Sequence, residues 1–432
     1  MSISERDAGS VWHPYTQHGI EPIVPSVARA AGTKLILEDG RELIDAISSW
    51  WVNLHGHAHP AIAEAITTQA QLLEQVIFAG FTHEPAVSFA ERLLAILPKN
   101  QKRVFYSDNG STAVEAAIKM ALQYHRNIGR KNKRILFLEN GYHGDTFGAM
   151  SVSSRGPFTK PFSSHLFPAT PIPVPTSDTD PNPIESLEKE LREGDVAAFI
   201  FEPLVQGAGG MNIYPASALD QMVSLCKKYE ALTIADEVMT GFGRTGALFA
   251  SLNLSSAPDI MCFSKGITGG FMALGATTCT DEIFQAFLSE SRTEMLFHGH
   301  SFTANPLALA AANASMTLLL TQDCRRAREQ IALRHQGFIE SLRGDSAFER
   351  PRTCGVILAV NLISAQGDSG YLSSLRDQIY RLSISRGVLL RPLGNVVYIL
   401  PPYCISESEL DQCHDTIRAI GEMVSRNEHG DR

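Results

Sequence analysis

The pattern of hydrophobic and polar residues changes about 85 residues into the chain. Residues 34–45 alternate apolar and polar side chains around Asp39-Gly40, which predicts a β-hairpin closed by a tight turn. Outside this hairpin, the first 60 residues predict an irregular N-terminal segment. Beyond residue 85, short apolar runs alternate with longer helical stretches. This order is typical of α/β folds with a mostly parallel sheet.

The alternating region predicts strands over 103–107, 134–138, 197–205, 232–235 and 260–263, and helices over 111–126 and 216–230. The Pro-rich residues 168–175 predict a loop. Asn305 is expected to cap a helix over 306–320. The remaining pattern predicts a helix, strand, helix, strand and helix over 325–343, 355–362, 371–386, 395–400 and 406–426.

The chain's size and composition set the broad class. A length of 432 residues is enough for two or three domains, and 44% hydrophobic with 19% charged residues is typical of soluble globular proteins. A net charge of −9 argues against a dedicated nucleic-acid binder. We find no apolar run long enough to span a membrane, and the polar residues 1–7 do not resemble a signal peptide.

The spacing of the cysteines indicates the cellular compartment in which the protein works. The seven cysteines are scattered and none forms a C-x-x-C pair. This pattern favours reduced thiols over a disulfide framework or a zinc site. We therefore expect a cytoplasmic protein.

Two ionisable residues stand at the ends of apolar runs. Asp236 ends the run from Leu232, and Lys265 follows the run from Ile260 to Phe263. Burying an ionised pair is costly unless it serves a purpose. One purpose explains both residues: the lysine forms a Schiff base with an aldehyde cofactor, and the aspartate pairs with the pyridine nitrogen of that cofactor. The pair therefore predicts pyridoxal phosphate (PLP).

A phosphate site is expected between residues 108 and 112. A strand ends there, Gly110-Ser111 forms a turn, and a helix begins, so free backbone N–H groups point at one place. The alternative is an ordinary helix cap, since Thr112 and Glu115 form a fair capping box. The presence of Asp236 and Lys265 favours the phosphate.

Two other motifs are set aside. Residues 241–246 match G-x-G-x-x-G, but the preceding strand ends in two acids that would repel a pyrophosphate. His55, His57 and His59 suggest a metal cluster, yet no Cys or carboxylate pair accompanies them, so we expect a polar turn and no metal site.

Three aromatic residues and one arginine are further candidates. Tyr142 follows a predicted strand and could stack on a planar cofactor ring. Trp50 and Trp51 adjoin on a segment expected to be extended, where they would face opposite ways, so at most one is expected to line a pocket. Arg391 ends an apolar run and has the fork needed to clamp a carboxylate.

Several segments together resemble one family. LTIADEVMTGFGRTG (232–246), PDIMCFSKGITGG (258–270) and HGHSFTANP (298–306) are similar to the class III aminotransferases, PLP enzymes of fold type I. Residues 12–16, 48–51, 140–151, 202–211 and 390–403 resemble the branch that aminates 8-amino-7-oxononanoate in biotin biosynthesis. The resemblance covers nearly the whole chain.

The resemblance implies residue roles. Lys265 matches the Schiff-base lysine, Asp236 the pyridine partner and Tyr142 the stacking aromatic, and these three are the expected catalytic residues. Val238 matches a residue that packs against the ring, and Gly110 and Ser111 match the phosphate turn. His300 and Ser301 match a segment that reaches the phosphate from a neighbouring subunit, which implies a homodimer with shared sites. The expected substrate residues are Tyr15, Trp50, Gly299 and Arg391.

The family also implies an organisation and an activity. The expected fold is α/β: residues 61–324 form a large PLP-binding domain, while segments 1–60 and 325–432 form a smaller α+β domain and part of the substrate site. The expected reaction is a ping-pong transamination of 8-amino-7-oxononanoate with S-adenosylmethionine as donor.

Several alternatives remain open from the sequence. Ser301 and His300 replace the usual Thr and a Pro, Ala273 stands where most class III members have Pro, and Leu393 stands where a Phe can line the substrate site. Lysine could replace S-adenosylmethionine as the donor. A pyruvate- or 2-oxoglutarate-linked ω-amino acid aminotransferase would share the cofactor chemistry, and an aminomutase would need no external donor. The non-enzyme alternative is a PLP- or dinucleotide-binding regulator.

Overall fold

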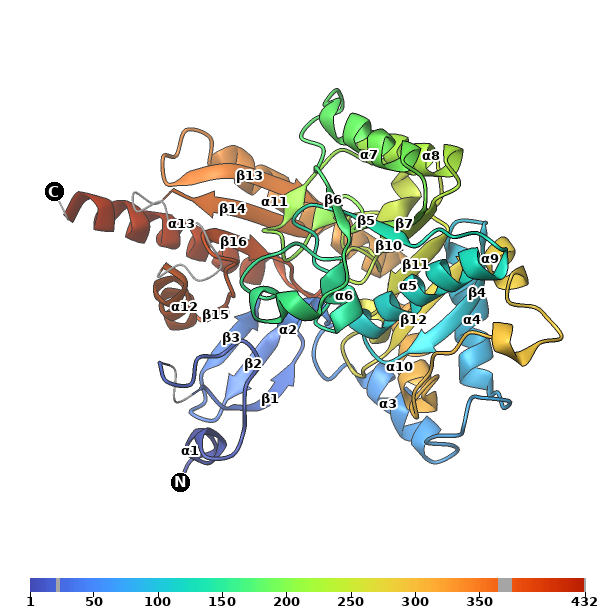
Figure 1. The fold of residues 1–432 in the computed structure, drawn as a ribbon. Helices are drawn as coiled ribbons and strands as arrows, with labels where there is room; N and C mark the ends of the chain where they lie inside the picture. The colour runs from blue at the N-terminus through green and yellow to red at the C-terminus, as the bar shows by residue number, and fades with distance from the viewer. Residues whose placement is uncertain (21–23, 364–374, 431–432) are drawn as a thin grey trace.

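The computed structural model describes residues 1–20, 24–363 and 375–430, arranged as two lobes (Figure 1). The larger lobe is built on a seven-stranded sheet, whose strands lie in the order β4 (Gln101–Ser107), β12 (Gly275–Thr280), β11 (Ile260–Phe263), β10 (Leu232–Asp236), β7 (Val196–Phe201), β5 (Arg134–Leu138) and β6 (Thr170–Ile172). β12 is antiparallel to both neighbours, and the other pairs are parallel. The mostly parallel α/β sheet expected from the sequence is confirmed.

Helices cover both faces of this sheet, which explains its continuous apolar strands. Every residue of β7 is buried. Ala198 and Ile200 pack in the cluster that α5 (Gly110–Asn127) shares with the sheet. Phe199 and Phe201 point the other way, into the core that contains α4 (Glu84–Ile96), α7 (Asn182–Arg192), α8 (Ala216–Lys228) and α10 (Pro306–Leu319).

The smaller lobe joins the two ends of the chain. A four-stranded sheet runs β1 (Val27–Ala31), β2 (Lys34–Leu37), β3 (Glu42–Asp45) and β15 (Val388–Leu389). β15 pairs in parallel with β3, with Val388 opposite Ile44 and Leu389 opposite Asp45. A second sheet contains β13 (Phe348–Cys354), β14 (Ile357–Leu362) and β16 (Val396–Ile399), and the helices of this lobe are α11 (Gln322–Ser341), α12 (Leu375–Ser385) and α13 (Glu407–Gly430).

Shorter elements complete the described chain. They are α1 (Ile3–Ala8), α2 (Ser48–Trp51), α3 (Pro60–Ala70), α6 (Phe147–Ser151), α9 (Asp281–Gln285), β8 (Val205–Gln206) and β9 (Asn212–Ile213), with 3-10 turns at Lys160–His165, Ala250–Asn253, Lys265–Thr268 and Arg292–Glu294. No helix in the described ranges is both long enough and apolar enough to cross a bilayer.

Most expected elements are present, and the differences have local causes. The hairpin is β2 and β3, and Asn305 caps α10 by accepting the N–H of Ala308 at 3.0 Å. The expected strand over 197–205 is split, because Pro203 lacks an N–H and Leu204 has a positive φ of 66°. The expected loop at 168–175 contains the edge strand β6, where Pro171 is tolerated.

Other strands were not expected at all. β1, β9, β12, β13 and β15 were missed, and the N-terminal 60 residues are more ordered than an irregular segment. β12 reads Gly-Ala-Thr-Thr-Cys-Thr, so its burial is not visible as an apolar run. The start of the helix expected over 371–386 falls on residues 371–374, which lie outside the described residues.

Candidate active site

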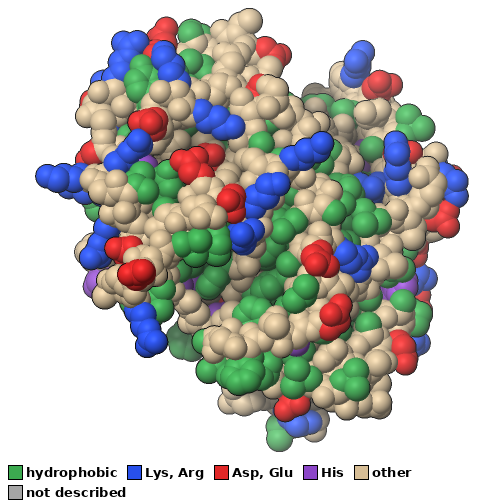
Figure 2. Space-filling model, turned by 90° about the vertical axis from the view of Figure 1, so that its right-hand side faces the viewer, with side chains coloured by type: hydrophobic (Ala, Val, Ile, Leu, Met, Phe, Trp, Pro, Cys, Tyr) green, Lys and Arg blue, Asp and Glu red, His purple; other side chains and the backbone are tan. Residues whose placement is uncertain are grey.

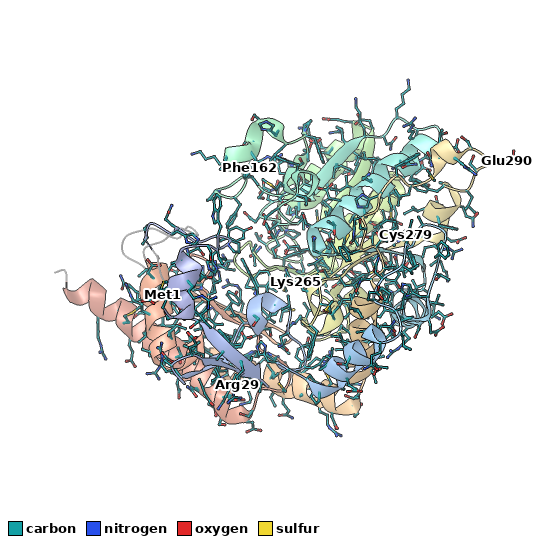
Figure 3. The ribbon with its side chains drawn as sticks, turned by 90° about the horizontal axis from the view of Figure 1, so that it is seen from below. Met1, Arg29, Phe162, Lys265, Cys279 and Glu290 are labelled. Carbon is teal, nitrogen blue, oxygen red and sulfur yellow. The ribbon has the colours of Figure 1, made fainter. Side chains whose placement is uncertain are left out.

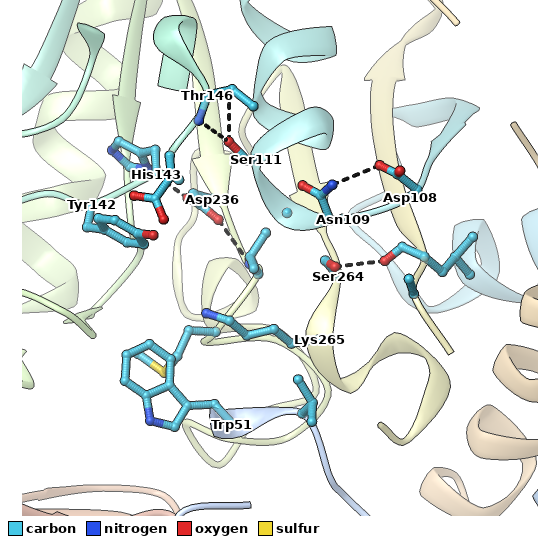
Figure 4. Close-up of a pocket in the computed structure, with 18 of the residues that line it drawn as sticks. Trp51, Asp108, Asn109, Ser111, Tyr142, His143, Thr146, Asp236, Ser264 and Lys265 are labelled. Carbon is cyan, nitrogen blue, oxygen red and sulfur yellow. Dashed lines mark hydrogen bonds and ion pairs between the residues drawn. The ribbon is translucent and has the colours of Figure 1, made fainter. Parts of the chain in front are cut away.

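A cavity of about 710 Å³ opens where strands of the large sheet end. Asp236 is the last residue of β10, Lys265 comes just after β11, and Asn109 caps α5 just after β4. The segment from Tyr142 to Thr146 follows β5 and lines the same cavity. Because the carboxyl ends of parallel strands meet at one edge, residues distant in sequence surround one space (Figure 4).

Asp236 is a buried carboxylate with two protein partners. Its Oδ2 lies 2.7 Å from Nδ1 of His143, and its Oδ1 accepts the N–H of Val238 at 3.0 Å. His143 is also buried, and within the described chain its Nε2 has no hydrogen-bond partner. The imidazole therefore fixes the orientation of the carboxylate that faces the cavity.

Glu202 is a second buried carboxylate in the cavity wall. It accepts the backbone N–H groups of Tyr142 at 3.1 Å and Gly207 at 2.9 Å. The pKa of Glu202 is raised to about 7, because burial outweighs the opposing effect of His143 and nearby Asp236 adds to the rise. Glu202 therefore holds the Tyr142 backbone in the cavity wall.

The amine of Lys265 reaches into the cavity. Its Nζ lies 4.4 Å from the centre of the Trp51 ring. Burial lowers the pKa of Lys265 to about 8, against the opposing pull of Asp236 and Glu202. Seen from below, Lys265 lies between the lobe that carries Arg29 and the lobe that carries Cys279 (Figure 3). A substantial fraction of this amine is neutral, and so nucleophilic, near physiological pH.

The N-terminus of α5 forms an anion cradle. Asn109 caps the helix by accepting the N–H of Thr112 at 3.0 Å, which leaves the N–H groups of Gly110 and Ser111 at the open end. A Cβ on Gly110 would lie 2.7 Å from Cγ1 of Val238, and one on Gly144 would lie 2.3 Å from Oγ of Ser111. Only glycine fits at these two positions.

A hydrogen-bond chain fixes Ser111. Its Oγ lies 2.7 Å from Oγ1 of Thr146 and accepts the Thr146 N–H at 3.1 Å. Thr146 in turn donates to Oε1 of Glu115 at 2.5 Å. The same carboxylate oxygen accepts the N–H groups of Gly148 and Ala149, so α5 and α6 are tied together behind the cradle.

Tyr142 and Val238 both line the cavity wall. Burial raises the pKa of the Tyr142 phenol, as does its hydrogen bond with Tyr15. The hydroxyl of Tyr15 also donates to Asp145. The Tyr142 ring packs edge to face on Phe158 at 6.4 Å. These contacts fix the plane of the Tyr142 ring.

A second cavity, of about 730 Å³, is lined by Trp50 and Arg391. The Arg391 guanidinium carbon lies 4.9 Å from the centre of the Trp50 ring. Tyr15 packs edge to face on Trp50 at 5.5 Å and so lies between the two cavities. One nitrogen of Arg391, Nη2, is buried and finds no partner within the described residues.

Known proteins resemble this chain over nearly its whole length. The family model described as aminotransferase class III matches residues 15–420. A protein of Synechococcus elongatus named adenosylmethionine-8-amino-7-oxononanoate aminotransferase is 48% identical, over 96% of this chain and 98% of its own. The chain belongs to the class III aminotransferases.

Solved structures agree with this assignment. The crystal structure of adenosylmethionine-8-amino-7-oxononanoate aminotransferase from Methanocaldococcus jannaschii has a TM-score of 0.92 and 31% identity, covering 98% of this chain and 99% of that one. A PLP-bound amine transaminase from an uncultivated Pseudomonas species has a TM-score of 0.88 and 29% identity, covering 96% and 99%. The protein is a PLP-dependent aminotransferase of fold type I.

The residues present fit this cofactor. An anion cradle, a buried carboxylate and a lysine amine lie in one cavity, as the phosphate, ring nitrogen and aldehyde of PLP require. Gly110, Ser111, Tyr142, Asp236, Val238 and Lys265 all line it. The structure thus brings together six of the eight residues expected to bind the cofactor.

The other two, His300 and Ser301, lie outside both cavities of this aminotransferase, as does Gly299. Ser301 is exposed, and Nε2 of His300 lies 4.0 Å from Oδ1 of Asp108 at the mouth of the cradle. Within one chain these residues make no wall of the site. Of the expected substrate residues, Trp50 and Arg391 line the second cavity and Tyr15 touches Trp50.

Three residues of the site were missed from the sequence. Trp51 lines the first cavity while Trp50 lines the second, so the expectation that at most one would line a pocket is wrong. The segment is a left-handed turn rather than extended. His143 and Glu202 were not singled out, although His143 stands next to Tyr142 and Glu202 ends an apolar run.

The two motifs that were set aside have structural roles in the described chain. Arg244 of the G-x-G-x-x-G segment is fully buried and donates to the carbonyls of Pro401, Asn53 and Trp51 at 2.9, 2.9 and 3.2 Å. His55 lies 3.1 Å from Ser315 Oγ, and His57 lies 2.8 Å from Asp45. Among the described residues, no group of three metal-ligating side chains gathers.

Proposed function

We propose that this aminotransferase converts 8-amino-7-oxononanoate into 7,8-diaminononanoate in biotin biosynthesis, with S-adenosylmethionine as the amino donor. The observation that carries the proposal is the 48% identity, over nearly the full length of both chains, to a protein named for this reaction. If lysine is the donor, the enzyme is a lysine-using diaminopelargonate synthase. If pyruvate or 2-oxoglutarate is the acceptor, it is a different ω-amino acid aminotransferase.

The second cavity suits this acceptor. 8-Amino-7-oxononanoate is a long apolar chain that ends in a carboxylate. Trp50 is 38% exposed, and Arg391 stacks on its ring with a buried nitrogen that has no partner among the described residues. A carboxylate would satisfy this nitrogen, and the planar fork of arginine allows two parallel hydrogen bonds. Tyr15 would contact the chain between the two cavities.

The first cavity would hold the cofactor through this chain's own groups. The N–H groups of Gly110 and Ser111 would bind the phosphate, together with the Ser111 hydroxyl. Tyr142 and Val238 would pack against the ring, and Asp236 would accept a hydrogen bond from the ring nitrogen. His143 would keep Asp236 turned toward that nitrogen.

The catalytic work of the protein is proton transfer and charge control. When bound, PLP supplies a pyridine ring that takes up the negative charge left when a proton leaves the carbon bearing the donor's amino group. Lys265, whose pKa of about 8 keeps part of it neutral, would accept that proton and return it at the next carbon. Asp236 would hold a proton on the pyridine nitrogen. The same groups would act in reverse on the acceptor, with Arg391 binding the carboxylates of donor and acceptor in turn.

We also propose a homodimer with shared sites. Large hydrophobic side chains stay exposed in two stretches, at Leu72, Ile77 and Phe81 and at Leu288, Met295, Phe297 and Phe302. Nε2 of Gln75 donates to the Ser301 carbonyl at 2.7 Å and so joins the two stretches. Hydrophobic side chains gather on this side of the molecule (Figure 2). A second copy on this face would bring its Gly299, His300 and Ser301 to the phosphate cradle.

The division of the chain is proposed on the same basis. Residues 61–324 contain all seven strands of the large sheet, and segments 1–60 and 325–432 share the sheet in which β15 pairs with β3. This pairing supports a small domain built from both ends of the chain, beside a large PLP-binding domain. A cytoplasmic location is likewise proposed, from the scattered cysteines.

Acceptor competition tests the proposed reaction. The enzyme is first converted to its amine-loaded form, and 8-amino-7-oxononanoate, pyruvate and 2-oxoglutarate are then offered together. We expect the oxononanoate to be consumed fastest. Faster consumption of pyruvate would replace the biotin assignment with a general ω-amino acid aminotransferase. Mixing the PLP form with each candidate amine, and following the loss of the lysine-bound cofactor's absorbance, decides between S-adenosylmethionine and lysine.

A further inference from the structure

The turn labelled α2, residues Ser48–Trp51, has an unusual backbone. Its four residues have positive φ values of 52°, 47°, 77° and 73°, all in the left-handed region. An L-residue with a Cβ rarely adopts this conformation, because the Cβ approaches the following carbonyl oxygen. Such residues normally occur singly, so a run of four persists only where the surroundings impose it.

The turn delivers two indoles to two different cavities. Trp51 lies against the amine of Lys265, at 4.4 Å from ring centre to Nζ. Trp50 lies under the guanidinium of Arg391, at 4.9 Å. In an extended strand adjacent side chains point to opposite faces. In the left-handed turn, Trp51 instead contacts Lys265 while its neighbour Trp50 contacts Arg391.

Asp45 supplies the contacts that hold the turn. It is fully buried at the end of β3. Its Oδ1 accepts the N–H of Ser49 at 2.9 Å, and its Oδ2 accepts the Ser49 hydroxyl at 2.7 Å. His57 fixes the carboxylate from the other side, with Nε2 2.8 Å from Oδ2. Both carboxylate oxygens of Asp45 therefore accept hydrogen bonds from Ser49, the residue that precedes Trp50.

Trp51 has further anchors of its own. Its Nε1 donates to the Tyr398 hydroxyl at 3.0 Å, its carbonyl accepts from Arg244, and its side chain is only 4% exposed. Trp50 is more exposed, and the contacts that orient it are the rings of Tyr15 and the guanidinium of Arg391. Loss of the Asp45 contacts should therefore displace Trp50 more than Trp51.

We propose that Asp45 is a positioning residue for acceptor specificity, which acts by holding the left-handed turn so that Trp50 braces Arg391. The proposal rests on the proposed function in one respect, because it takes the Trp50–Arg391 pair as the place where the acceptor's carboxylate binds. Asp45 itself lines neither cavity and acts only through the turn.

A double-mutant cycle tests whether Asp45 acts through Trp50. With the holoenzyme and 8-amino-7-oxononanoate as acceptor, Asp45→Ala should raise the acceptor KM by about tenfold or more, while kcat changes by less than about threefold. In a Trp50→Ala background the same change should alter the KM by less than about twofold, because coupled residues are not additive. Equal fold-changes in both backgrounds would overturn the proposal, as would a loss confined to kcat.

Tryptophan fluorescence gives a readout that does not depend on the substrate. We expect Asp45→Ala to make the emission of the holoenzyme more quenchable by acrylamide, and this increase to vanish in a Trp50→Phe background. An unchanged quenching constant would contradict the proposal. If the wild-type enzyme does not use the oxononanoate, the proposed function fails and the quenching experiment still decides the role of Asp45.

Two matched variants separate positioning from folding. Asp45→Asn keeps an oxygen for the Ser49 N–H and should recover part of the wild-type KM, even if Asp45→Ala folds poorly. Asp39→Asn makes the same change in the exposed turn of the hairpin, where the carboxylate bonds to Arg41, and should leave KM and quenching unchanged. Suppose that Asp45→Asn and Asp45→Ala raise the acceptor KM equally, and that the effects of both on KM and quenching are the same with and without Trp50. The proposal is then wrong.

Discussion

His143 and Asp236 form a buried pair, with Nδ1 of the imidazole 2.7 Å from Oδ2 of the carboxylate. Asp236 comes from the end of β10 and His143 from the loop that follows β5. The hydrogen bond fixes the orientation of Asp236 from the protein side of the cavity. A carboxylate held in this way is preorganised to keep a proton on a ring nitrogen, at no cost of rearrangement during the reaction.

Replacing Asp236 by asparagine tests this role. Asp236→Asn keeps the shape of the side chain but removes the charge that stabilises a protonated pyridine. We expect transamination to slow by at least ~10²-fold, about 2.7 kcal/mol in the barrier. Asp259→Asn is the matched control, since Asp259 is a carboxylate bonded to Thr233 at the opposite end of β10. A near-normal rate in folded Asp236→Asn would remove this residue from the mechanism.

Lys265→Ala should abolish transamination. Without the amine, the group proposed to carry the proton is lost, and the covalent bond to the cofactor cannot form. We expect the absorbance band of the lysine-bound cofactor to be lost, while noncovalent binding through the phosphate cradle persists in equilibrium dialysis. Turnover at the wild-type rate would show that another group performs the proton transfer.

The pKa of Lys265 predicts the pH dependence of cofactor uptake. Burial lowers this pKa to about 8, so the neutral, reactive amine predominates as the pH rises above about 8 rather than above 10.5. The rate of covalent PLP uptake by the apoenzyme should therefore rise with a midpoint near pH 8. In Asp236→Asn the carboxylate that favours the charged amine is lost, so the midpoint should move to lower pH. Stopped-flow absorbance measures both midpoints.

Subunit complementation tests the shared site. Ser301→Ala should weaken PLP retention, because a hydrogen bond to a charged phosphate contributes roughly 1.5–3 kcal/mol. If Ser301 serves the partner's site, a heterodimer of Lys265→Ala and Ser301→Ala chains contains one complete site. An equimolar mixture should then hold about a quarter of its sites at wild-type affinity, by twofold symmetry. No recovery on mixing, or full activity in a monomer, would contradict shared sites.

Arg391 should decide how the acceptor carboxylate binds. A lysine offers a point charge without the planar fork, so Arg391→Lys should not be conservative. Arg391→Ala should impair use of 8-amino-7-oxononanoate more than use of pyruvate, which does not reach the Trp50 face. Steady-state KM values for the two acceptors measure this difference. An equal effect on both would place the carboxylate elsewhere.

The features that the sequence revealed are those carried by short, contiguous patterns. Asp236 and Lys265 were found because each follows an apolar run, and parallel packing then brings the strand ends together. His143 was not found because its partner lies 93 residues away and neither residue signals the other. The expectation that at most one of Trp50 and Trp51 lines a pocket was wrong because nothing in Ser-Ser-Trp-Trp predicts four left-handed residues. That conformation is imposed by Asp45, His57 and the surrounding lobe, which are contacts of the folded chain.

The parallel pairing of β3 with β15 has a consequence for the order of folding. Ile44 and Asp45 meet Val388 and Leu389, so strands near the two ends of the chain must come together. During synthesis the hairpin emerges from the ribosome early, but its edge partner is made only after the whole large sheet. Contacts this distant in sequence form late and slowly. We therefore expect the lobe that carries the tryptophan turn to be completed after the sheet that carries Lys265. Until β15 has been synthesised, the edge of β3 that pairs with it stays unpaired.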